Sequence, residues 1–170
     1  YLLIRNYDFK QLPIRWNWSI IFWVPFIFAL VGLFGDLVTT LTGKYNYFNP
    51  DLFAYIDFTQ IIGKFLALSP IAIAYALLNG FYEEFFFLGL LTSVKEKHKW
   101  LILIYSTSIR ISFHTYQGLV WALVIGVVYG LFYYFLYKYK IKNLLPLFLM
   151  HALADMFGSS LIYLLVAWGT

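Results

Sequence analysis

The chain has 170 residues, of which 62% are hydrophobic, 23% are aromatic and only 12% are charged. Soluble domains carry about 25% charged residues, so this composition excludes an ordinary soluble domain. The net charge of +4 comes mainly from short loops, which is typical of membrane topology and not of nucleic-acid binding.

Long apolar runs dominate the sequence and predict an all-α fold, a polytopic transmembrane helix bundle. A transmembrane β-barrel would alternate apolar and polar residues with period two, and these runs do not. We expect one domain, in which residues 1–16 form an interfacial segment of basic and aromatic residues and residues 17–170 form the helical domain. Because the chain begins with Tyr1 and not with Met, we expect upstream residues to be missing.

The first two predicted spans differ in length. The first covers residues 17–38 and contains Pro25, which a membrane helix tolerates because neighbouring helices can satisfy the freed carbonyl. The second covers residues 59–93, which is longer than the about 20 residues that one straight span needs. Pro70 or Gly80 should therefore mark a kink or a re-entrant break.

The rest of the chain predicts three further helical stretches, which gives about five spans. They cover residues 100–114, 119–137 and 144–168, and the last is either one helix or two helices that break at residues 158–160. A GxxxG pattern begins at Gly126, and such patterns are common where membrane helices pack closely.

Basic residues alternate between the predicted loops. Residues 1–16, 94–99 and 138–142 are basic, whereas residues 39–57 and 115–118 are not. Because alternate loops face alternate sides of the membrane, the positive-inside rule places the three basic segments in the cytosol. The loop over residues 39–57 is rich in turn residues and has room for a short interfacial helix.

Two adjacent carboxylates, Glu83 and Glu84, lie within the second predicted span between mostly apolar stretches. An ionised carboxylate at the centre of a bilayer costs at least a few kcal/mol unless it holds a proton or meets a cation. The pair therefore predicts a functional or essential structural role. Asp36 lies at the end of the first span, and Lys64 is expected to snorkel to the outer interface.

Two further polar pairs lie on predicted spans. Arg110 and His114 are four residues apart, so they share one helix face. His151 and Asp155 have the same spacing. Because a polar stripe facing lipid would be unsatisfied, we expect both pairs and Glu83 to converge on one acid–base site in a low-dielectric pocket.

Three segments resemble the sequence motifs of the CPBP family, which comprises CAAX-processing endopeptidases and the bacteriocin-processing or self-immunity proteins often labelled Abi. The family pattern is EExxxR, then FxxxH, then HxxxN or HxxxD. The similarity covers about residues 60–168, which would form the catalytic core. The matching residues are Glu83 and Glu84, then His114, then His151 and Asp155.

The resemblance implies an intramembrane endopeptidase that cleaves a small hydrophobic peptide, lipidated or bearing a leader, through glutamate-activated water. It implies a hydrophobic peptide and membrane lipid as partners, no nucleic acid, and a location in the bacterial cytoplasmic membrane. The alternative is a non-catalytic member of the same fold that acts as a bacteriocin immunity factor or a scaffold. A proton-coupled transporter would also need buried carboxylates and histidines, but the internal repeat expected of one is not evident.

Carried over residue by residue, the resemblance makes Glu83 the general base, which activates a water together with His114. His151 and Asp155 match the positions expected to stabilise the oxyanion, and Asp155 fits there if it is protonated or orients His151. Glu84 is expected to be structural or to tune Glu83.

We expect no cofactor and a site without metal, because the two histidines come from different helices. The sequence contains no cysteine, which excludes disulfides, thiolate nucleophiles and cysteine-based zinc sites. The alternative is a catalytic zinc held by Glu83, His114 and His151, whose side chains are of the right ligand types. No HExxH helix signature supports that alternative.

The chain departs from the family pattern at two positions. The arginine that closes the first motif is Leu88 here, and the residue four positions before His114 is Arg110 where the family has Phe. We hypothesise that Arg110 supplies, from a neighbouring helix, the positive charge that balances one of the glutamates.

Overall fold

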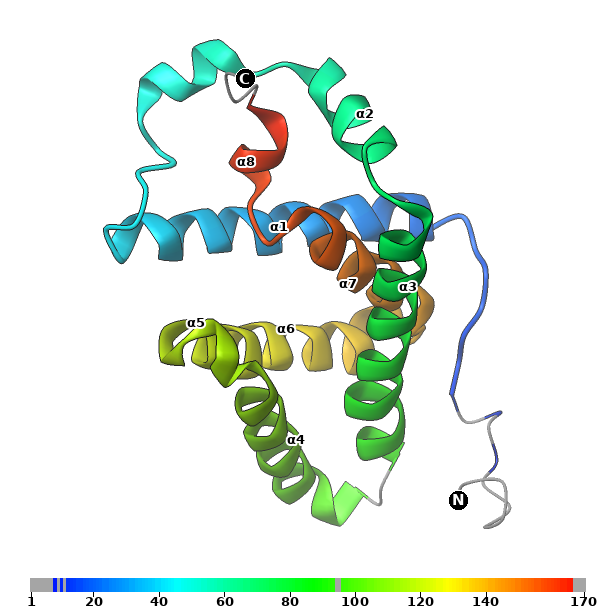
Figure 1. Ribbon diagram of the computed structural model, residues 1–170. Helices are drawn as coiled ribbons and strands as arrows, with labels where there is room; N and C mark the ends of the chain where they lie inside the picture. Colours follow the sequence, from blue (N-terminus) through cyan, green and yellow to red (C-terminus); the bar gives the residue numbers. More distant parts are fainter. Residues whose placement is uncertain (1–7, 9, 11, 94–95, 167–170) are drawn as a thin grey trace. The chain divides into compact units, whose positions relative to one another are not determined.

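The computed structural model describes residues 8, 10, 12–93 and 96–166, and these are mostly helical (Figure 1). Within these residues no strand is formed, and a single isolated bridge joins Ile56 to Val166. The predicted all-α class is therefore confirmed. Most of the predicted interfacial segment, including Arg5, lies outside the described residues, as do Lys95 and the last four residues of the chain.

The chain is organised in two compact units, and each combines segments that are far apart in the sequence. One unit contains Tyr1–Asn17 and Tyr82–Leu147, and we call it the α4 unit. The other contains Trp18–Phe81 and Phe148–Thr170, and we call it the α8 unit. The helix that leads to Glu83 and the helix that carries His151 each contribute to both units, because the chain crosses between units after Phe81 and again after Leu147.

The α8 unit combines helices from the beginning and the end of the chain. Its elements are α1 (Ile20–Leu41), a 3₁₀ helix (Pro50–Tyr55), α2 (Phe58–Leu66), most of α3 (Pro70–Glu84), most of α7 (Leu145–Phe157) and α8 (Leu161–Leu165). The break in the second predicted span lies at Pro70, which begins α3 after α2 has ended. Gly80 lies inside α3, so the chain does not break there.

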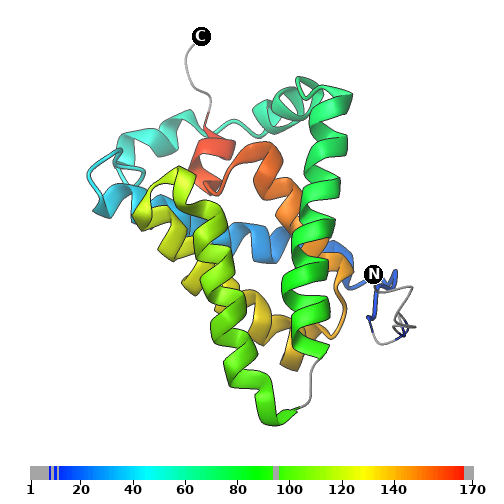
Figure 2. The ribbon, with the colours of Figure 1, turned by 60° about the horizontal axis from the view of Figure 1, so that its bottom comes forward.

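Apart from its first segment, Tyr1–Asn17, the α4 unit consists of the middle of the chain (Figure 2). Its main elements are α4 (Lys99–His114), α5 (Leu119–Leu123), α6 (Gly130–Phe135) and three π-helical segments, Phe85–Leu90, Val124–Tyr129 and Leu136–Ile141. The fourth predicted span is thus one helical run that alternates between α and π geometry. It ends four residues later than the sequence predicted, at Ile141.

Three helical runs in the described part of the chain are long and apolar enough to cross a membrane: Ile20–Leu41, Pro70–Ser93 and Leu119–Ile141. The sequence predicted about five spans. The helix α4 has 16 residues and α7 has 13, so at about 1.5 Å per residue they rise about 24 and 20 Å. Both are shorter than the hydrocarbon core of about 30 Å, which explains the difference.

The end of the chain forms two short helices, α7 and α8, and the five-residue α8 is held at both termini. At its N-terminus the carboxylate of Asp36, which is fully buried, accepts hydrogen bonds from the backbone N–H groups of Leu161 (3.1 Å) and Ile162 (3.0 Å) and from the Ser160 hydroxyl. A negative charge complements the positive end of the helix dipole. This contact could not be predicted from local sequence features, because Asp36 and α8 are far apart in the chain.

The C-terminus of α8 is held by Lys64 of α2. Its ammonium group donates to the backbone carbonyls of Tyr163 (2.7 Å), Leu164 (2.9 Å) and Val166 (3.0 Å). The Lys64 ammonium thus satisfies three carbonyls at the C-terminus of a nearby helix. Its place at the outer interface stays a prediction.

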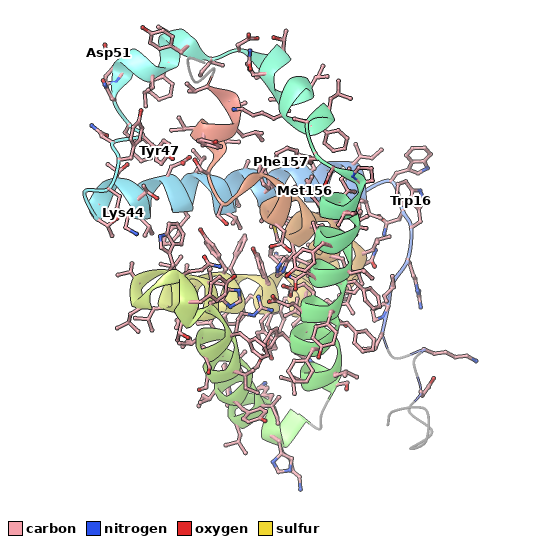
Figure 3. All side chains as sticks on the ribbon, viewed as in Figure 1. Trp16, Lys44, Tyr47, Asp51, Met156 and Phe157 are labelled. Carbon is pink, nitrogen blue, oxygen red and sulfur yellow. The ribbon has the colours of Figure 1, made fainter. Side chains whose placement is uncertain are left out.

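Replacing Asp36 by alanine is expected to lower the free energy of unfolding by about 2 kcal/mol, because the N–H groups of the half-buried Leu161 and the buried Ile162 lose their acceptor. Denaturant titration in detergent measures this loss. The matched control is Asp51→Ala, an exposed carboxylate on the 3₁₀ helix between α1 and α2 (Figure 3). Equal unfolding free energies for the two variants would contradict the capping role of Asp36.

Candidate active site

The two glutamates stand at the C-terminal end of α3 and belong to the α4 unit. Glu84 is completely buried, whereas Glu83 is partly exposed. Adjacent helix positions point about 100° apart, so the two carboxylates enter different surroundings. The tandem motif therefore places two chemically identical groups in two environments.

Glu84 forms a buried ion pair with Arg110 of α4. One guanidinium nitrogen, Nη2, donates to the Oε2 atom of Glu84 at 3.0 Å, and only 2% of the arginine side chain is exposed. The guanidinium also lies over the ring of Phe87, 4.4 Å from its centroid, and 5.8 Å from that of Tyr133. Removing one partner of such a pair strongly destabilises the folded protein, because the other partner stays buried as an uncompensated charge.

Leu88, at the position of the family's arginine, is 2% exposed and lies in the π-helical segment after α3. An apolar side chain fills the position from which the family's arginine would come. In this chain the positive charge close to the tandem glutamates comes from α4 instead, through Arg110.

His114 is the last residue of α4 and is almost buried, at 7% exposure. Its Nδ1 atom lies 2.8 Å from the backbone carbonyl of Arg110, one turn earlier. A carbonyl can only accept, so Nδ1 is the protonated nitrogen in this contact. In the neutral imidazole Nε2 is then the nitrogen that can accept a proton, as a base or a water-holding group requires.

The helix α4 lies unusually close to the π-helical segment Val124–Tyr129. A Cβ atom added at Gly126 would lie 2.3 Å from Cγ1 and 2.9 Å from the backbone nitrogen of Ile111, the residue that follows Arg110. The close packing predicted from the GxxxG pattern is thus present at Gly126. This contact fixes the part of α4 that carries Arg110 and His114.

Substituting Gly126 by alanine should destabilise the α4 unit by about 1–3 kcal/mol, because backbone atoms of Ile111 cannot yield as a flexible side chain would. Gly63→Ala is a matched control, since nothing lies within 4 Å of a Cβ at that helical position. The control should be neutral or slightly stabilising. Thermal unfolding of both variants in detergent checks the prediction, and equal midpoints would refute the close approach.

His151 and Asp155 lie on α7, in the α8 unit. The Nε2 atom of His151, a buried residue, is 3.7 Å from the Oδ1 atom of Asp155. The other carboxylate oxygen, Oδ2, accepts a hydrogen bond of 2.9 Å from the side-chain amide of Asn79 on α3. Sequence reasoning missed Asn79, although its position four residues before Glu83 in an apolar helix was a usable signal.

The structure therefore groups the predicted site residues in two sets. Glu83, Glu84, Arg110 and His114 belong to the α4 unit, while His151 and Asp155 belong to the α8 unit together with Asn79. Within neither unit do three described His, Asp or Glu side chains form a group that could hold a metal ion. Of the three ligands in the zinc alternative, Glu83 and His114 belong to the α4 unit and His151 belongs to the α8 unit.

Comparison with known proteins identifies one family. The sequence profile of the family described as type II CAAX prenyl endopeptidase Rce1-like matches residues 65–157, a segment that contains every predicted site residue. No curated protein and no solved structure gives a significant match. With three apolar runs able to span a membrane, the chain is an integral membrane protein. Because the profile covers more than half of the sequence, the chain belongs to the type II CAAX prenyl endopeptidase Rce1-like family, a family of membrane proteases.

Proposed function

We propose that the chain is an intramembrane endopeptidase in which Glu83 activates the attacking water. The observation that carries this proposal is the unequal treatment of the two glutamates. Glu84 is buried in an ion pair with Arg110, while Glu83 is partly exposed and points elsewhere on the helix. The first is suited to holding the fold together, and the second is suited to taking up and releasing a proton.

In the proposed reaction, Glu83 takes one proton from a water molecule while Nε2 of His114 accepts a hydrogen bond from that water. The water oxygen forms a bond to the carbon of the peptide carbonyl. Glu83 then gives the proton to the leaving nitrogen as the C–N bond breaks. The products are a new carboxyl group and a new amine, so water is consumed and no other reactant is needed.

His151 would donate a hydrogen bond to the carbonyl oxygen as it becomes an oxyanion. Its partner Asp155 accepts a hydrogen bond from Asn79 at one oxygen and faces His151 with the other. This arrangement suits a carboxylate that holds the imidazole in one orientation. We therefore assign Asp155 to the orientation of His151, because a bare carboxylate facing the oxyanion would repel it.

The proposed substrate is a hydrophobic peptide that bears a lipidated cysteine or a leader, and it reaches the site from the membrane. The family description names CAAX prenyl endopeptidases, and a CAAX sequence is a C-terminal segment whose cysteine carries a prenyl chain. We propose membrane lipid as the surrounding partner, the bacterial cytoplasmic membrane as the location, and no nucleic acid. We also propose that the reaction needs no metal.

Alanine in place of His114 or His151 is expected to lower kcat about 10²- to 10⁴-fold, the usual contribution of a general acid–base group. The assay uses the purified full chain in lipid nanodiscs and an internally quenched peptide that ends in a farnesylated Cys-aliphatic-aliphatic-X sequence. The matched control is His98→Ala, an exposed histidine that precedes α4. An unchanged kcat in both site variants would overturn the proposed function.

The zinc alternative, with Glu83, His114 and His151 as ligands, predicts a different response in the same assay. A strong chelator would then abolish cleavage, and added zinc would restore it. Metal-free catalysis predicts that the rate is the same with and without the chelator.

A second candidate function follows from Leu88, which replaces the arginine of the first motif. A non-catalytic member of the family would act as a bacteriocin immunity factor or as a scaffold for another membrane protein. Full biological activity of alanine variants at Glu83, His114 and His151 would favour this non-catalytic function. Loss of activity in variants that reach normal membrane levels would exclude it.

A further inference from the structure

Asn79 connects the two motif helices within the α8 unit. It lies on α3, and its amide nitrogen is 2.9 Å from Oδ2 of Asp155 on α7. The next residue, Gly80, allows the two helix backbones to approach: a Cβ there would lie 2.8 Å from the carbonyl oxygen of Phe148 and 3.0 Å from the nitrogen of Ala152. The family pattern assigns no role to position 79.

In this hydrogen bond Asn79 is the donor and Asp155 is the acceptor. An amide NH₂ group can only donate, so the hydrogen bond is strongest when Asp155 is an ionised acceptor. The other oxygen, Oδ1, then presents negative charge to Nε2 of His151 at 3.7 Å. A carboxylate oxygen can only accept, so at that distance it is a partner for an N–H group of the imidazole and influences how the His151 ring is held.

We propose that Asn79 is a positioning residue of the peptidase: it holds the Asp155 carboxylate in the orientation in which it supports His151. The proposal rests on the proposed function, because its readout is peptide cleavage. Asn79 itself does not touch the reacting atoms. Its effect on the reaction depends on Asp155, whereas the effect of a residue that serves packing alone would not.

The test compares Asn79→Ala with wild type on the farnesylated probe. Loss of the orienting hydrogen bond should lower kcat about 10- to 100-fold at nearly constant KM, the size expected when a group moves by about 1 Å. Asn79→Leu keeps most of the side-chain volume in an apolar helix and serves if the alanine variant does not accumulate. The matched control is Leu78→Ala, an exposed neighbour on α3 with 69% exposure.

A double-mutant cycle with Asp155→Ala tests whether Asn79 acts on kcat through Asp155. If Asn79 acts through Asp155, Asn79→Ala lowers kcat in the wild-type background and has almost no further effect on kcat when Asp155 is already alanine. An equal fold-loss in both backgrounds overturns the proposal, as does a wild-type kcat for both Asn79 variants. If the wild-type chain leaves the probe intact, the proposed function fails and the role of Asn79 in it falls as well.

Discussion

Replacing Glu83 by glutamine should lower kcat on the farnesylated probe about 10³-fold while the protein accumulates normally. Glutamine has nearly the same size and shape as glutamate but cannot take a proton from water. The loss should appear in kcat and in kcat/KM alike, because the missing interaction belongs to the transition state. Steady-state kinetics of the purified full chain, at matched protein concentration and confirmed folding, give the measurement.

The neighbouring Glu84 provides an unusual control for this prediction, because it has the same side chain one position later. Glu84→Gln should reduce stability, since it weakens the buried contact with Arg110. The folded fraction of that variant should retain much of its kcat. If Glu83→Gln kept wild-type kcat, or if only Glu84→Gln lost it, the assignment of the base would be wrong.

Reversing the charge of Arg110 is expected to abolish accumulation of folded protein. Arg110→Glu would place a second carboxylate beside the fully buried Glu84, and Arg110→Met would leave Glu84 as a buried charge without its cation. Removal of one partner from a buried pair costs about 3–5 kcal/mol. Membrane-fraction levels and denaturant titration in detergent report both effects.

A compensating double variant separates the loss of the pair from a general loss of packing. Because the lone buried charge is the costly element, Glu84→Gln combined with Arg110→Met should be more stable than Arg110→Met alone. The matched control is Arg15→Met, which removes an exposed cation from the same unit. Wild-type levels and an unchanged unfolding transition for Arg110→Glu would contradict the structural role of this pair.

The helical class and most helix boundaries follow from local features of the sequence. The apolar runs predict membrane helices because a bilayer leaves no other way to satisfy the backbone. Pro70 begins α3 because proline fits the first turn of a helix and cannot continue one. The predicted third helix, over residues 100–114, differs from α4 by one residue at its start.

The contacts between distant segments could not be predicted in the same way. Asp36 and Lys64 hold the two ends of α8, yet more than 95 residues separate each of them from that helix. Helical periodicity tells which residues share a face, but it does not tell which face meets which neighbour. The hydrogen bond from Asn79 to Asp155 was missed for the same reason.

The motif residues show a similar division. The sequence predicted that Arg110 balances the charge of Glu83 or Glu84. Helix geometry alone could not decide which of the two glutamates faces the guanidinium. The structure gives Glu84 as the partner, at 3.0 Å. The hydrogen bond from His114 to the Arg110 carbonyl, which determines which ring nitrogen can act as a base, also needed coordinates.

The most direct test of glutamate-activated water is mass spectrometry of the products that the purified full chain releases from the farnesylated probe in oxygen-18 water, with and without a metal chelator. A Glu83-dependent peptidase predicts a single cut, heavy oxygen in the new carboxyl group, the same rate with chelator, and cleavage by Glu83→Gln that is about 10³-fold slower. An intact probe with wild-type protein, or cleavage by Glu83→Gln at the wild-type rate, would contradict it.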